Sequence, residues 1–101
     1  MHRTVAIAAA LFAAATGAAA QTADPNLGRN IAASCANCHG TGGVSKGVVA
    51  TLAGQPKEVL VRKMQDYKAG RGDPTVMHQL AKGYTDEQID LAAAWFAAQK
   101  P

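Results

Sequence analysis

Residues 35–39 read CANCH, and this stretch decides how the rest of the 101-residue chain is interpreted. Two cysteines separated by two residues and followed directly by a histidine form the pattern C-x-x-C-H. Two thiols at this spacing can add across the two vinyl groups of one haem, and the adjacent imidazole then lies close to the iron. The motif therefore predicts one covalently bound haem, with Cys35 and Cys38 as its attachment points and His39 as an iron ligand.

Three alternative roles for the two cysteines account for fewer of the motif residues. A disulfide between Cys35 and Cys38 would leave His39 without a role. A thioredoxin-like dithiol would need a βαβ setting, which the sequence pattern does not offer. A zinc site needs four protein ligands, and beyond the motif only His78 is a good candidate for the fourth.

The first twenty residues are typical of a secretory signal peptide. A short basic start, MHRT, precedes the apolar run VAIAAALFAAA of residues 5–15, and residues 18–20 supply the small side chains of a cleavage site. The run is shorter than the roughly 20 apolar residues of a membrane-spanning helix. We therefore expect cleavage of residues 1–20 and export to the periplasm without a membrane anchor. Residues 21–101 are then expected to fold as a single domain with one haem.

The expected mature chain has little apolar material for a core. Its aromatic residues are few, namely Tyr67, Tyr84, Trp95 and Phe96. Domains this small commonly depend on a disulfide, a metal or a cofactor for stability. An apolar cofactor at the centre would supply the missing core. The basic residues are spread along the sequence, and this spacing does not favour a nucleic-acid partner.

Hydrophobic spacing and end signals predict an all-α domain of three to four helices. Helix starts are predicted at Asp24-Pro25 and at Gln55-Pro56, and the capping box TDEQ of residues 85–88 marks the start of the last helix. A short helix or turn is predicted over residues 75–82. Gly28 interrupts the first helix, which indicates close packing against another element. No stretch alternates with a period of two, so strands are not expected.

The second iron ligand is expected to be a methionine, because a thioether favours ferrous iron. Met64 lies on the apolar stripe of the second helix, where a role in the core is the usual one. Met77 lies in a segment bracketed by glycines and a proline, which can bring its side chain over the iron. His78 could ligate instead, although a histidine there is more often an exposed polar residue. An open or displaceable sixth position, which would suit a haem enzyme or a gas-sensing module, is the other alternative.

Four stretches carry a resemblance to a known family: CANCHGT (35–41), LAGQ (52–55), YKAG (67–70), and Met77 with LAKGYTDEQI (80–89). With these stretches the chain resembles the class I c-type cytochromes, and among them the cytochrome subunit of flavocytochrome c sulfide dehydrogenase. The resemblance implies a small cytochrome c fold whose first and last helices cross, with Gly28 allowing Trp95 or Phe96 to approach. It also implies that Met77, rather than His78, is the axial ligand.

A protein of this kind is expected to carry single electrons rather than to catalyse a reaction. Its expected partners are redox proteins, such as a flavoprotein sulfide dehydrogenase as donor or a terminal oxidase as acceptor. It would act as a monomer or as one subunit of a heterodimer. Lysines around the exposed haem edge would increase the rate of encounter, and the candidates for this role are Lys46, Lys57 and Lys82.

The sequence departs from the family pattern at two positions. Ala50 stands where the family usually has proline, at the residue whose backbone carbonyl receives the ring proton of the proximal histidine. The carbonyl is retained, so ligation by His39 is expected to survive. Gly72 stands where the family tends to have an arginine, and Arg71 is shifted by one residue. A contact between Arg71 and a haem propionate is therefore not expected.

Overall fold

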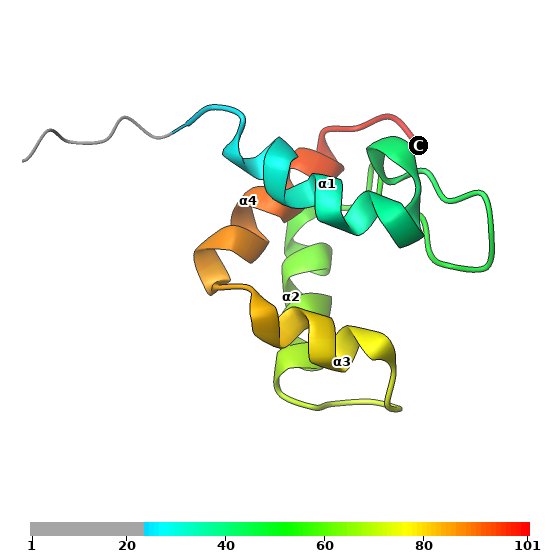
Figure 1. Cartoon of the computed structure of the whole chain (residues 1–101), viewed down its shortest axis with the longest axis vertical. Coiled ribbons are helices and arrows are strands. Elements are labelled where there is room, and N and C mark those ends of the chain that lie inside the picture. Colours follow the sequence, from blue (N-terminus) through cyan, green and yellow to red (C-terminus); the bar gives the residue numbers. More distant parts are fainter. Residues whose placement is uncertain (1–23) are drawn as a thin grey trace, which may run out of the picture.

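A computed structural model describes residues 24–101, so the predicted signal peptide of residues 1–20 lies outside the described residues. Over the described range the chain forms helices and no strand, which confirms the all-α prediction. The elements are α1 (Leu27–His39), the 3-10 turn η1 (Thr41–Gly43), α2 (Lys57–Lys68), α3 (Val76–Leu80), the 3-10 turn η2 (Ala81–Gly83) and α4 (Asp86–Ala97). Figure 1 shows α1 near one end of α2 and α3 near the other.

The predicted helix ends are mostly confirmed. The capping box of α4 is present, since the Thr85 hydroxyl accepts a hydrogen bond from the Gln88 amide at 3.1 Å and the Gln88 side chain accepts one from the Thr85 amide at 2.9 Å. Helix α2 begins directly after Pro56. The predicted short helix over residues 75–82 is formed by α3 and η2.

The predicted start of the first helix at Asp24-Pro25 is wrong by two residues. The Asp24 carboxylate accepts a hydrogen bond from the Asn26 amide at 2.8 Å, and the helix begins only at Leu27. An aspartate that binds the amide two residues on closes a turn of its own. The Asp24 side chain therefore stabilises a turn that precedes the helix, and it does not cap the helix.

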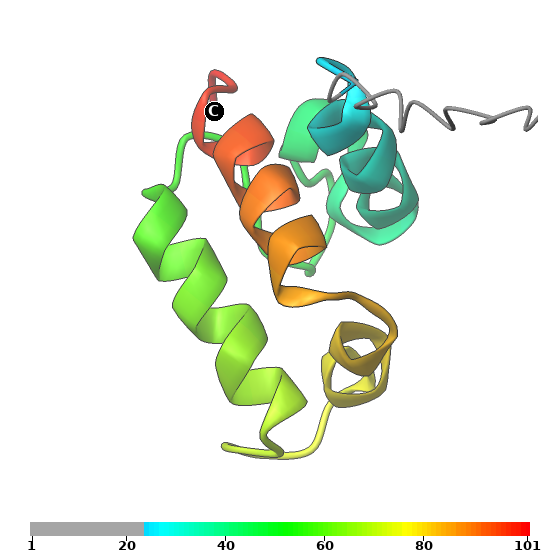
Figure 2. The same ribbon diagram turned by 90° about the vertical axis from the view of Figure 1, so that its left-hand side faces the viewer.

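Helix α4 lies between α1 and α2 and packs against both (Figure 2). The close approach at Gly28 is confirmed, but its partner is not the predicted Trp95 or Phe96. A β-carbon on Gly28 would lie 2.7 Å from the backbone carbonyl oxygen of Leu91. Leu91 precedes Trp95 by four residues, so the two helices meet one turn earlier along α4 than expected.

Phe96 instead packs against Gly43 in the loop after α1. A β-carbon on Gly43 would lie 2.6 Å from Cδ1 of the Phe96 ring, and its φ of 82° lies in the left-handed region that favours glycine. The loop that follows the CANCH motif is therefore fixed to the last helix by contact between a backbone and a ring.

Substitution of Gly28 by alanine is expected to destabilise the protein by up to about 2 kcal/mol. Alanine gains about 1 kcal/mol in helix propensity, but its methyl group would collide with the Leu91 carbonyl and force α1 away from α4, at a cost of about 1–3 kcal/mol. Guanidinium unfolding of the haem-loaded protein measures the change. Gly47→Ala is the matched control, because its β-carbon would meet no atom within 4 Å. Equal stability of the two variants would contradict the packing argument.

The core is small, as the composition predicts. Among residues 24–101, five of the eight buried hydrophobic residues are alanines, and the larger ones are Leu60, Ile89 and Phe96. The main cluster joins α1, α2 and α4 through Ala32, Leu60, Ala92, Ala93 and Phe96. Alanine contributes little apolar area per residue, so contacts within the polypeptide give this domain a modest hydrophobic stabilisation.

Polar contacts tie the start of α4 to the end of α2. The Lys68 ammonium donates to the Tyr84 carbonyl at 2.8 Å and to the Asp86 carboxylate at 3.1 Å. The side-chain amide of Gln65 also donates a hydrogen bond to the Asp86 carboxylate, at 2.9 Å. These hydrogen bonds, first that from Gln65 and then that from Lys68, hold the pKa of Asp86 below its ordinary value of 3.8.

Asp86→Asn is expected to remove a small, pH-dependent part of the stability. Because the folded-state pKa is lowered, the contribution of the carboxylate is present above pH 3.8 and is lost as the pH falls through the folded-state value. The stability difference between wild type and variant should therefore be present at neutral pH and shrink in acid. Unfolding midpoints of wild type and variant, compared at neutral pH and in acid, measure this difference. Glu87→Gln, in the same helical turn, is the control, and an identical pH profile for both variants would assign the effect to the helix dipole.

Candidate haem site

The motif residues lie on the last turns of α1. Cys35 is half-buried against the core cluster, whereas Cys38 is exposed, and both thiols are free. Burial raises the pKa of the Cys35 thiol. Residues three apart on a helix are neighbours on its surface, so the two sulfurs are presented from one side of α1.

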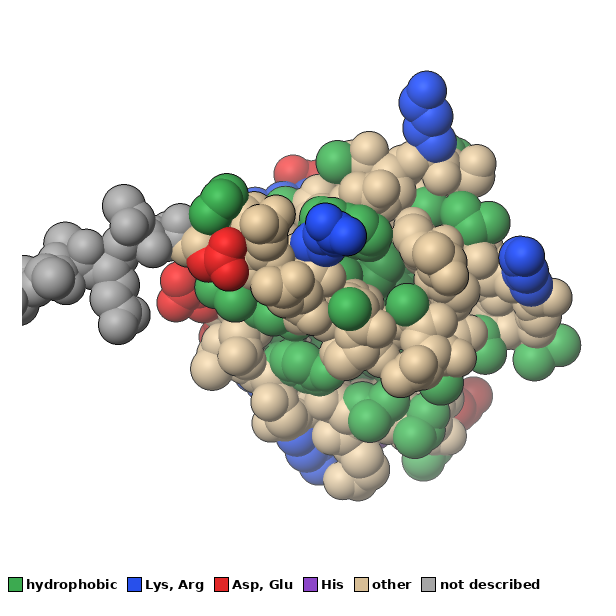
Figure 3. Space-filling view, turned by 45° about the horizontal axis from the view of Figure 1, so that its top comes forward, with side chains coloured by type: hydrophobic (Ala, Val, Ile, Leu, Met, Phe, Trp, Pro, Cys, Tyr) green, Lys and Arg blue, Asp and Glu red, His purple; other side chains and the backbone are tan. Residues whose placement is uncertain are grey.

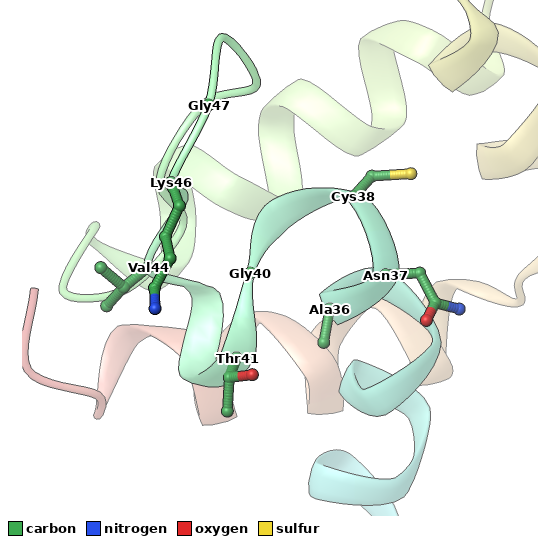
Figure 4. A pocket seen from close by; sticks show the side chains of 8 residues that line it. All are labelled: Ala36, Asn37, Cys38, Gly40, Thr41, Val44, Lys46 and Gly47. Atoms are coloured by element: carbon green, nitrogen blue, oxygen red, sulfur yellow. The ribbon is translucent and has the colours of Figure 1, made fainter.

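A pocket of about 400 Å³ lies beside the motif, between the end of α1 and the loop that follows it. Figure 4 shows that the Cys38 sulfur points away from Thr41, Val44 and Lys46, which line this pocket. Cys38 also lines the pocket, together with Ala36 and Asn37, but its sulfur does not point toward the other lining side chains, so we do not assign the pocket to the haem.

The His39 ring is held by the backbone of the loop. Its Nδ1 lies 2.6 Å from the carbonyl oxygen of Ala50. Because a carbonyl can only accept, Nδ1 carries the proton and Nε2 keeps a free lone pair. The expected carbonyl contact is thus made by Ala50 in place of proline.

Backbone hydrogen bonds return the loop to the motif. The Gly43 carbonyl accepts from the Leu52 and Ala53 amides at 2.8 and 3.1 Å. The Ser45 amide donates to the Thr51 hydroxyl at 3.1 Å. These contacts close the loop over residues 43–53 and place the carbonyl of residue 50 against His39. A hydrogen bond of this kind to the second ring nitrogen orients a histidine that ligates a metal.

Met77 lies on a different element from the motif. It is half-buried on α3, which packs against α2 and η2. The structure therefore brings Cys35, Cys38 and His39 together on α1 and places Met77 on α3, which lies near the opposite end of α2 from α1 (Figure 1). Met64, predicted in the core, is only half-buried on α2 and lies outside the main core cluster.

The prediction that His78 is an exposed polar residue is wrong. Its side chain is 8% exposed, and both ring nitrogens have partners within the chain. Nε2 donates to the Arg71 carbonyl at 2.7 Å, and Nδ1 accepts from the Thr75 amide at 3.1 Å. With these partners a buried imidazole is fully satisfied, and neither nitrogen is left for a metal.

Some of the charged residues considered as haem or docking contacts form ion pairs within the chain. Arg71 pairs with Asp66 at 2.9 Å. Lys57 pairs with Asp90 at 3.0 Å. Lys46 and Lys82 are exposed. On the face shown in Figure 3 the Lys and Arg side chains stand apart from one another, with apolar side chains between them.

The donor set fits a haem better than a zinc ion. Two thiols on one side of a helix, an oriented imidazole with a free nitrogen and a thioether on another helix are the groups that attach and ligate a haem. In the part of the chain that the structure describes, no three side chains of His, Cys, Asp or Glu gather closely enough to hold a metal ion. Over the same residues, no helix combines the length and the apolar character needed to cross a membrane.

Comparison with known proteins agrees with this geometry, although no protein-family model matches the chain. The cytochrome subunit of sulfide dehydrogenase from Chlorobaculum tepidum is 40% identical over 82% of this chain and 79% of that protein. Cytochrome c4 from Pseudomonas aeruginosa is 36% identical over 84% of this chain and 43% of its own length. The thiosulfate dehydrogenase electron acceptor from Thiomonas intermedia is 33% identical over 100% of this chain and 46% of its own length.

The chain thus spans most of the first of these relatives and slightly less than half of the other two. All three names describe cytochromes or electron acceptors. They confirm the resemblance that the sequence motifs indicate, and the all-helical structure agrees with it. The chain therefore belongs to the c-type cytochromes.

Proposed function

We propose that this chain is a periplasmic cytochrome with a single haem, and that it transfers single electrons between redox partners without being a catalyst itself. Cys35 and Cys38 would hold the haem through thioether bonds, and His39 and Met77 would be the axial ligands. When bound, the haem supplies an iron that cycles between ferric and ferrous states.

The observation that carries the proposal is the hydrogen bond between His39 and Ala50. It fixes the tautomer that leaves Nε2 free, on the residue directly after the two attachment cysteines. A histidine held in this way has little freedom to reorient. An axial ligand that stays in place through a change of oxidation state suits a carrier, because little has to rearrange when one electron arrives.

The second axial ligand is supported by exclusion as well as by position. His78 has both ring nitrogens engaged, and its neighbour Met77 offers a thioether from the same short helix. With His39 and Met77 both bound, the iron would have no position for a substrate. This arrangement favours electron transfer over the alternative of an enzyme or a gas sensor.

The names of the relatives suggest the electron donor. One is a subunit of sulfide dehydrogenase and another is the electron acceptor of thiosulfate dehydrogenase. The proposal therefore extends to a dehydrogenase of reduced sulfur compounds as donor, a flavoprotein sulfide dehydrogenase in the first instance, and to a terminal oxidase as acceptor. The exposed Lys46 and Lys82 are the remaining candidates for docking, since Lys57 is paired with Asp90.

Intact mass and optical spectra of the protein purified from a periplasmic fraction test this proposal. The expected mass is that of residues 21–101 plus one haem, and the ferric spectrum should show a methionine-to-iron charge-transfer band. Addition of sulfide together with the flavoprotein dehydrogenase should reduce the haem. A high-spin ferrous spectrum with rapid binding of carbon monoxide would support the open-site alternative instead. A mass without haem would refute attachment altogether.

A further inference from the structure

His78 is the buried polar side chain of the described domain, and electron transfer as proposed above gives it no role. Its position is unusual, because it directly follows Met77 on a helix of only five residues. A helix this short has little stability of its own. Contacts outside the helix must therefore hold α3, and with it Met77, in place.

The imidazole of His78 joins both ends of the connection between α2 and α3. Through Nε2 it donates to the Arg71 carbonyl at 2.7 Å, just beyond the end of α2. Through Nδ1 it accepts from the amide of Thr75, the residue that caps α3, at 3.1 Å. The two ends of the segment of residues 71–75 are thus both hydrogen-bonded to the His78 side chain.

Arg71 and the His78 ring are both anchored to α2. The Arg71 amide donates to the Asp66 carbonyl at 2.9 Å, and its guanidinium pairs with the Asp66 carboxylate. The ring of Tyr67, also on α2, meets the His78 ring edge to face, with centroids 5.3 Å apart and planes at 64°. Loss of the imidazole would remove the hydrogen bond to Arg71 and the aromatic contact with Tyr67, which join α3 to the rest of the domain, and also the hydrogen bond that caps α3 itself.

We propose that His78 is a positioning residue that holds α3 against the end of α2 and so determines how often the Met77 side chain leaves the iron. The inference rests on the proposed role of Met77 as axial ligand. Movement of α3 carries that side chain away from the iron, and such local openings have free energies set by the contacts that they break. The hydrogen bond to Arg71 and the ring contact with Tyr67 are together enough to change the population of the open state about ten-fold or more.

Competition by imidazole in the ferric, haem-loaded protein measures this opening. An external ligand reaches the iron only in the open state, so its apparent affinity rises with the open fraction. For His78→Ala we expect imidazole to displace the methionine, as followed by its charge-transfer band, with an affinity about ten-fold or more above wild type. Gln79→Ala, an exposed neighbour on α3, is the matched control and should match wild type.

Two further variants separate the contacts of the ring and guard against a failure to fold. The side-chain amide of His78→Gln can still donate to the Arg71 carbonyl, and the side-chain oxygen of His78→Asn can still accept from the Thr75 amide. Both should give affinities between wild type and His78→Ala. Hydrogen exchange of the Thr75 amide should accelerate in His78→Ala and His78→Gln, and less in His78→Asn, which keeps an acceptor for this amide.

The outcomes distinguish this inference from the proposed function. A charge-transfer band in wild type, together with unchanged imidazole affinity in all three His78 variants, would overturn the positioning role and leave the ligand assignment intact. The positioning role would also be overturned if the variants lower only the global unfolding free energy. Absence of the band in wild type would overturn the ligand assignment itself, and the positioning role with it.

Discussion

Replacement of both Cys35 and Cys38 by serine is expected to abolish covalent attachment of haem and to leave a polypeptide without a stable fold. Serine cannot form the thioether bonds, so the intact mass should fall by that of one haem. The loss of structure follows from the small core of the described domain, in which five of eight buried hydrophobic residues are alanines. A domain of this size needs the additional apolar contacts of a cofactor. Mass spectrometry under denaturing conditions and circular dichroism measure the two effects.

The single variants should differ from each other. Cys35 packs against the core cluster, whereas Cys38 is exposed. Cys35→Ser therefore removes one thioether and also places a hydroxyl beside apolar side chains, while Cys38→Ser removes a thioether alone. The first should be the less stable of the two. Asn37→Ser changes an exposed position within the motif and should keep both haem and stability. Haem that stays bound to the double variant after denaturation would contradict the attachment assignment.

Sequence reasoning predicts well those features that depend on neighbours in the chain. The capping box at Thr85 and Gln88 and the start of α2 after Pro56 are local signals, and both are found in the structure. The attachment motif is local too, since its residues share one helix. The carbonyl contact of His39 with Ala50, which the family resemblance implies, is confirmed as well, and it joins residues only eleven positions apart.

Predictions that depend on contacts between distant elements succeed less often. Gly28 indicates that a helix approaches closely, but not which turn of that helix, and the partner is Leu91 rather than Trp95 or Phe96. The error has a physical reason, because any residue along the facing side of α4 can supply a backbone for the contact.

His78 shows the same limit at the candidate site. Polarity favours exposure, and burial becomes possible only because the Arg71 carbonyl and the Thr75 amide are both within reach. One signal in the sequence does indicate that the His78 side chain is buried. Thr75 and His78 have the three-residue spacing of a capping box, with histidine in the place of glutamate or glutamine. Recognition of that variant would have predicted that the ring faces the helix start instead of the solvent.

Met77→Ala is expected to abolish the methionine-to-iron charge-transfer band and to lower the reduction potential, while the haem stays covalently attached. Loss of the thioether removes the ligand that favours ferrous iron. His78 should not replace it, because both of its nitrogens are held by the Arg71 and Thr75 backbone. The ferrous variant should therefore be high-spin and bind carbon monoxide rapidly.

Met64→Leu is the matched control for this prediction. Met64 is half-buried on α2, and leucine preserves most of its volume, so the charge-transfer band should survive the change. Survival of the band in Met77→Ala, together with its loss in Met64→Leu, would move the axial ligand from α3 to α2. That outcome would also remove the basis for the positioning role of His78, because α3, the helix that His78 holds, would carry no iron ligand. The spectra of these two variants therefore decide whether the packing around α3 holds an iron ligand in place.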